Sequence, residues 1–223
     1  MRFRFAALTA TAPAHVTRVS GLDAMAQSDK IFLEDGQVLA GQLANPSIMF
    51  QTAYGTVQVP NTAVRKIERR KQAGADEIYT ELLTTVNEER ISGFLANEYI
   101  ELSVSGGPNL QVRKELVRSV VYGQRSKPDI LAKDYFVMKN NDVFYGTVLD
   151  SSFQLTTSYG AYNTSFANIL KIEEVPGGQT RLFLSDGNTV QGFIATDFIR
   201  VRTNYGFEFR IPKSSLKVIQ LRR

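Results

Sequence analysis

The chain has 223 residues, of which 43% are hydrophobic and 22% are charged, a composition that permits a sizeable core and excludes a typical disordered protein. The net charge of +4 permits acidic partners but excludes the heavy basic bias of a dedicated nucleic-acid coat protein. The lack of cysteine excludes disulfides and thiolate metal sites. No apolar run approaches the ~20 residues of a membrane-spanning helix, so we predict no transmembrane helix.

Residues 1–26 differ in character from the rest of the chain. Arginines close to Met1 precede an apolar stretch, and small residues follow at 12–14 and 24–26, as in a short signal peptide. Three interpretations stay open: a short export signal, an unstructured arm, or an extension upstream of a chain that begins at Met25. An export signal would place the protein in a bacterial envelope or periplasm, whereas the other interpretations leave it cytoplasmic. We predict that this segment lies outside the fold.

The remainder repeats one pattern four times: an apolar strand, a polar turn, a strand with a glycine, a second glycine after the next strand, and an apolar closing strand. The first glycine of each copy is followed 13 or 14 residues later by the second. The first glycines are Gly41, Gly93, Gly146 and Gly192, and the second are Gly55, Gly106, Gly160 and Gly206. Such regular spacing indicates one supersecondary unit copied three times.

Apolar and polar residues alternate within each copy, which is the period of a half-buried strand. Ile199 and Val201 fall on one face of such a strand, and Arg200 and Arg202 fall on the other. The turns carry residues that accept positive φ, as two-residue type I′ hairpins require. These are Asp35 and Gly36, Asn140 and Asn141, and Asp186 and Gly187. Each strand glycine is expected to let the strand bend sharply or bulge, and Gly41 and Gly192 are expected where the strand bends or where a neighbouring backbone comes close.

The sequence therefore predicts an all-β fold of four tandem small-barrel or curved antiparallel sheet repeats, arranged as two pseudo-symmetric halves. The repeats are expected around residues 31–68, 78–121, 135–173 and 181–220, with one strand order and little helix. Residues 27–124 hold repeats one and two, and residues 125–223 hold repeats three and four.

The segment 33–43, with its Asp35 and Gly36 turn and its strand glycine Gly41, resembles the first motif of Sm-like proteins. That resemblance implies a five-stranded small barrel for each copy. The tandem pattern is also similar to β repeats in bacterial envelope proteins of unknown function. Residues 44–47 and 60–62 lack the Asp and Asn pair and the Arg-Gly with which Sm-like proteins grip RNA, so no RNA-binding residue is carried over.

The predicted repeats lack the residue combinations of common catalytic sites. The only histidine, His15, lies in the N-terminal segment, so triads and histidine metal sites are excluded from the repeats. The acidic pairs at 88–89 and 173–174 are adjacent in sequence and point to opposite faces of a strand, so we interpret them as solvated turn residues. We predict a protein that is not an enzyme and that has no cofactor or catalytic metal.

Two sets of side chains are candidate binding residues. Three tyrosines in equivalent positions form either a stacking platform or packing for their own hairpins: Tyr54, Tyr159 and Tyr205. Basic residues form either a stripe for phosphate or another partner, or a solvated rim. These are Arg65, Lys66, Arg69, Arg70, Lys71, Arg200, Arg202 and Arg210.

Repeat arrays create extended surfaces, and no catalytic constellation is evident. We therefore predict a non-catalytic structural or adaptor protein that binds other proteins through its β-repeat surface and assembles with itself. The alternatives are an Sm-like nucleic-acid-binding protein that uses the basic repeat ends, and an envelope module that binds carbohydrate or lipid.

Overall fold

The computed structural model of the chain describes residues 28–71, 79–126 and 133–222. Of these described residues, 64% lie in β-strands, and none lies in an α-helix. Their twenty strands form one antiparallel sheet that does not close on itself. The all-β class and the scarcity of helix are therefore confirmed, and no helix among the described residues could cross a membrane. The predicted N-terminal arm, 1–26, lies outside the described residues.

Ten strands follow one another in residues 28–126. They are β1 (Asp29–Leu33), β2 (Val38–Leu43), β3 (Ser47–Thr52), β4 (Gly55–Pro60), β5 (Val64–Lys71), β6 (Tyr79–Thr85), β7 (Arg90–Leu95), β8 (Tyr99–Ser103), β9 (Asn109–Arg113) and β10 (Val117–Val121). A short 3-10 turn stands immediately before the fifth strand and another before the tenth. These turns are η1 (Asn61–Ala63) and η2 (Lys114–Leu116).

Residues 133–222 present the same order of elements. Their strands are β11 (Asp134–Met138), β12 (Val143–Val148), β13 (Ser152–Thr157), β14 (Gly160–Ser165), β15 (Ile169–Val175), β16 (Gln179–Leu184), β17 (Thr189–Ile194), β18 (Phe198–Thr203), β19 (Glu208–Pro212) and β20 (Leu216–Gln220). The 3-10 turns again precede every fifth strand. They are η3 (Phe166–Asn168) and η4 (Lys213–Ser215).

The strands follow the alternation that the sequence predicts. In β18, Ile199 and Val201 are buried while Arg200 and Arg202 are exposed. Removal of such apolar side chains from water stabilises each strand by roughly 1.5–3 kcal/mol for every buried Val or Ile. The buried residues form one continuous hydrophobic core along the sheet.

The first turn of each copy differs from the expected type I′ hairpin. Gly36 N donates to Leu33 O over 3.1 Å, and Leu33 N donates to Gln37 O over 2.9 Å, which encloses a three-residue loop. Only the glycine has a positive φ, of 90°, while the Asp35 carboxylate accepts the Gln37 N–H. Gly187 occupies the same place in the last copy, with φ 87°. The prediction of two positive φ values was wrong, because the aspartate stabilises the turn through its side chain instead.

Strand pairing crosses between the predicted copies. β2 pairs with β1 and then with β8, and β7 pairs with β6 and then with β3. The second half repeats this exchange, since β12 pairs with β18 and β17 pairs with β13. The pairing order defines four groups of strands: A (β10–β1–β2–β8–β9), B (β5–β6–β7–β3–β4), C (β20–β11–β12–β18–β19) and D (β15–β16–β17–β13–β14). Each group combines two strands of one predicted copy with three of its neighbour.

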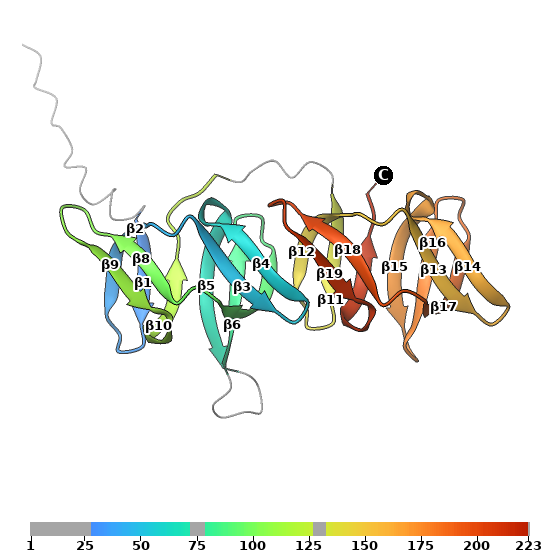
Figure 1. The fold of residues 1–223 in the computed structure, drawn as a ribbon, viewed down its shortest axis with the longest axis horizontal. Coiled ribbons are helices and arrows are strands. Elements are labelled where there is room, and N and C mark those ends of the chain that lie inside the picture. Colours follow the sequence, from blue (N-terminus) through green and yellow to red (C-terminus); the bar gives the residue numbers. More distant parts are fainter. Residues whose placement is uncertain (1–27, 72–78, 127–132, 223) are drawn as a thin grey trace, which may run out of the picture.

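The four groups lie in a row in the order A, B, C, D (Figure 1). Groups A and B are joined by the pairing of β10 with β5, and groups C and D by the pairing of β15 with β20. Among the described residues, strands of groups B and C pair at a single bridge from β7 to β12, where Arg90 faces Val143. Side chains therefore have to carry most of the contact at the centre of the row.

Each strand glycine lies where the exchanged strand comes closest. A Cβ on Gly192 would lie 2.5 Å from the carbonyl oxygen of Thr156, and one on Gly41 would lie 2.4 Å from that of Ser103. Gly93 and Gly146 approach the neighbouring backbone in the same way, at 2.2 Å and 2.8 Å. The prediction that the strand bends or a neighbouring backbone comes close at Gly41 and Gly192 is confirmed for the close backbone.

Gly192→Ala should destabilise the protein, because the new Cβ meets the Thr156 carbonyl, a backbone atom that cannot swing aside. We expect the free energy of unfolding in urea to fall by about 1–3 kcal/mol. Gly107→Ala is the matched control, since its Cβ would lie no closer than 3.4 Å to other atoms and its φ is not positive. The control should change stability by less than about 0.5 kcal/mol. Equal stabilities of the two variants would contradict the proposed role of the close approach.

Candidate functional site

Two buried carboxylates occupy the centre of the row, where groups B and C meet. Glu89 immediately precedes β7 and Asp142 immediately precedes β12, and each residue is 1% exposed. Each carboxylate accepts a backbone N–H from the opposite group. Ser92 N donates to Asp142 Oδ1 over 2.8 Å, and Tyr145 N donates to Glu89 Oε1 over 2.9 Å. The acids therefore connect the two groups where the main-chain ladder is nearly absent.

Two of the predicted tyrosines complete this central junction. Tyr54 of group B donates its hydroxyl to Asp142 Oδ2 over 3.0 Å, and Tyr205 of group C donates its hydroxyl to Glu89 Oε2. The Tyr54 ring stacks on Phe209 of group C with ring centroids 5.4 Å apart. The contact is reciprocal, because each group contributes one tyrosine and one carboxylate.

Burial sets the protonation of these groups. It raises the pKa of Glu89 above its ordinary value of 4.5, against the hydrogen bonds from Tyr205, Tyr145 N and Thr85, which lower it. Burial and the charge of Asp142 raise the pKa of the Tyr54 hydroxyl well above its ordinary value, and burial and Glu89 do the same for Tyr205. Both hydroxyls therefore remain protonated donors.

The third predicted tyrosine has a different environment. Tyr159 lies in the turn between β13 and β14 and is 73% exposed, whereas Tyr54 is 6% exposed. Tyr54 is thus packed in the junction and has no free ring face for a base or sugar. Stacking of a ligand stays a prediction for Tyr159 and for the partly buried Tyr205.

The basic candidates lie on β5 and on the hairpin of β18 and β19, and most of them are engaged within the chain. Five pair with nearby acids: Arg65 with Glu88, Lys66 and Arg70 with Glu68, Arg200 with Asp150, and Arg202 with Glu208. Arg210 lies over the ring of Phe198, 4.6 Å from its centroid, and Lys71 ends β5. Neighbouring acids thus neutralise much of the positive charge that a phosphate would need.

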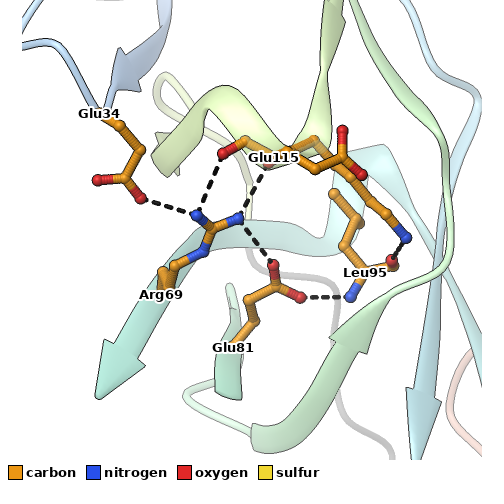
Figure 2. Close-up of polar contacts among 6 residues, drawn as sticks. Glu34, Arg69, Glu81, Leu95 and Glu115 are labelled. Atoms are coloured by element: carbon orange, nitrogen blue, oxygen red, sulfur yellow. Dashed lines mark hydrogen bonds and ion pairs between the residues drawn. The ribbon is translucent and has the colours of Figure 1, made fainter. Parts of the chain in front are cut away.

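Arg69 is the most enclosed of these basic candidates and ties groups A and B together (Figure 2). Its guanidinium donates to Glu34 Oε1 over 2.8 Å and to the carbonyl oxygens of Glu115 and Lys114 over 3.2 and 3.1 Å. The carboxylate atom Glu81 Oε1 lies 3.8 Å from Arg69 Nη2. The side chain is 19% exposed, and its bonds to Glu34, Glu115 and Lys114 join group B to group A.

Sequence reasoning missed the two central acids. The prediction that Glu88 and Glu89 are both solvated is wrong for Glu89, because that side chain points into the junction while Glu88 is exposed. The strand period contained the signal: Ile91 and Gly93 form the inward face of β7, and Glu89, two residues before Ile91, continues that face. The prediction that Glu173 and Glu174 are turn residues is also wrong, because both lie in β15. At these partly buried positions Glu173 pairs with Lys171 and Glu174 pairs with Lys139.

Four strands present one unpaired edge each. In the registers of the described residues, β4, β9, β14 and β19 each have a single partner, β3, β8, β13 and β18 respectively. Such an edge exposes main-chain N–H and C=O groups that can pair with another strand. β14 has no charged residue and no proline, and most of it is exposed. It is therefore the least protected of the four edges.

The part of the chain that the structure describes holds no cluster of three or more His, Asp or Glu side chains placed for a metal ion. No family model, curated protein or solved structure matches the chain.

Arg69→Ala should cost more stability than Arg70→Ala, because Arg69 bonds two carbonyl groups and two acids in a half-buried site while Arg70 forms one exposed pair. We expect a loss of about 1–3 kcal/mol for Arg69→Ala. The exposed pair should contribute less than about 1 kcal/mol. Urea unfolding of both variants measures the difference, and equal losses would contradict it.

Glu89→Gln should change how stability depends on pH. Because the pKa of Glu89 is raised in the folded state, that state binds more protons between the ordinary value of 4.5 and the raised pKa. The stabilising contribution of Glu89 is therefore complete below pH 4.5 and is lost as pH rises through the folded pKa. The variant cannot titrate at this position, so its free energy of unfolding should improve relative to the parent as pH rises through that window. Urea unfolding at a series of pH values tests this, and a constant difference would rule it out.

Proposed function

We propose that this chain is a non-catalytic structural or adaptor protein that binds other proteins through the unpaired edges of its strand groups and assembles with itself. The observation that supports the proposal most is the free edge of β14, which has β13 as its single partner among the described residues. Addition of an extended segment to such an edge supplies main-chain hydrogen bonds, and the neighbouring side chains select the sequence.

In this proposal the groups are small β-barrel-like repeats, exchanged in pairs within residues 27–124 and 125–223. The close approach at each strand glycine supports the repeat, because the four glycines have the same neighbour relation. A rigid row of four such repeats would hold several edges at fixed spacing, which suits a protein that organises others.

The chemistry of the edges favours a protein partner over nucleic acid. β14 is uncharged along Gly160–Ser165, so it lacks the cations that attract phosphate. The candidate arginines on β5 and β18 are paired with acids in the chain. A partner peptide in extended conformation, with mostly polar side chains, would suit the exposed part of β14.

Edge binding can be tested with one backbone N–H. Phe166 N donates to Ser151 O, so the alternate residue Asn163 directs its N–H away from β13 and toward the free edge. Peptides selected by display against the full chain should bind Asn163→Pro at least tenfold more weakly than the parent, because proline removes that donor. Asn163→Ala keeps the donor and should bind within about twofold of the parent.

Titration of a labelled peptide with each folded variant gives the affinities. A display selection that yields no peptide, or peptides that bind both variants equally, would overturn edge binding. Tight binding of an oligonucleotide that weakens by about 10³-fold between 50 and 200 mM salt would favour the nucleic-acid alternative instead.

A further inference from the structure

The outer end of group D carries the features that meet a partner at the central junction. Asp142 stands four residues before Gly146 and is buried there, and Asn188 stands four residues before Gly192 but is exposed. The turn tyrosines show the same contrast, since Tyr54 is buried and Tyr159 is exposed. Group D thus presents a tyrosine and a polar acceptor without the second group that covers them in the middle of the row.

The turns that hold the two tyrosines are built alike. Thr52 Oγ1 donates to Gly55 O over 2.6 Å and accepts the N–H of Tyr54. Thr157 Oγ1 donates to Gly160 O over 2.7 Å and accepts the N–H of Tyr159. Because the same two hydrogen bonds fix both turns, the side chain of Tyr159 extends from its turn in the same direction as that of Tyr54.

The acceptor on group D is an amide instead of a carboxylate. Asn188 donates through Nδ2 to Asp186 Oδ2 over 2.9 Å, which leaves its Oδ1 as the atom suited to accept a hydroxyl. A neutral amide costs less to bury than a carboxylate, which suits an interface that must also be exposed in the separate chain.

We propose that the group D ends of two copies join about a twofold axis as groups B and C join within one chain, with Tyr159 of each copy donating to Asn188 of the other. The proposal rests on the self-assembly named in the proposed function. Group A is the less suitable end, because Ser105 stands two residues after Ser103, where Tyr159 stands two residues after Thr157. A twofold contact between D ends satisfies two tyrosines, whereas a contact of D with A satisfies one.

The central bridge predicts which residues face each other across the axis. Arg90 and Val143 pair at the B–C junction, and each stands three residues before its strand glycine. Thr189 has that position in group D and is exposed. In the proposed dimer Thr189 therefore lies opposite Thr189 of the second copy.

A cysteine at this position can trap the dimer, because the chain has no cysteine of its own. Residues directly opposite in antiparallel strands have Cα atoms about 4.5–5.5 Å apart, within the range that a disulfide spans. We expect Thr189→Cys to form a covalent dimer under mild oxidation and Val38→Cys, at the same position of group A, to stay monomeric. A mixed dimer of the two variants without a Thr189→Cys homodimer would show head-to-tail contact, and that result or no dimer at all would overturn the proposal.

Sedimentation equilibrium of the cysteine-free chain provides a second measurement. Tyr159→Ala should raise the dimer dissociation constant at least tenfold. Tyr79→Ala, an exposed tyrosine at the start of β6, should leave it unchanged. Equal constants for all three proteins would contradict the proposal. If the cross-link fails but peptides still bind Asn163→Pro more weakly than Asn163→Ala, this inference alone is wrong. If the cross-link forms but peptides bind the two Asn163 variants equally, edge binding alone is wrong.

Discussion

The close approach of two backbones at each strand glycine is the constraint on which the rest of the structure depends. Any Cβ at Gly41, Gly93, Gly146 or Gly192 would lie 2.2–2.8 Å from a carbonyl oxygen of the exchanged strand. Since the two strands come from different predicted copies, the strands of one predicted copy do not form a complete group. Completion of groups A and B therefore requires pairing between residues 43 to 61 positions apart in the sequence.

The sequence predicted the strands and the role of their glycines but not the exchange between copies. Alternation tells which face of a strand is buried, and a strand from either neighbouring copy offers the same faces. A residue in the connector after Gly41 marks the exchange: Asn45 accepts the N–H of Glu101, in the middle of the exchanged strand β8, over 2.7 Å. Asn97 accepts the N–H of Met49 in the same way. In residues 28–126 an asparagine four residues after the strand glycine thus binds the exchanged strand. Asp150 stands at the same place after Gly146 and accepts the N–H of Arg200 over 2.8 Å.

The central junction is held together by different contacts from the joins on either side of it. Groups A and B, like C and D, share a ladder of main-chain bonds, so many backbone groups fix their relation. Groups B and C share one bridge and rely on two buried acids. A buried acid stabilises little by itself, because desolvation offsets its attraction to donors. What it contributes is orientation, since Glu89 and Asp142 lose their donors if the groups turn relative to each other.

The location of one negative charge distinguishes the inner turns from the outer ones. In the turn before β12, Asn140 precedes Asp142, so the acid faces the junction. In the turn before β17 the order is reversed: Asp186 precedes Asn188, so the acid lies exposed in the turn and the amide takes the facing position. The local pattern of strands and glycines does not reveal which of the two orders a turn has, because an acid before an amide and an amide before an acid close the same turn. The acid stands in the facing position where a tyrosine of the neighbouring group reaches it, and an amide stands there at the end of the row. The chemistry of the turns thus distinguishes the inner groups from the outer ones, which their common backbone does not.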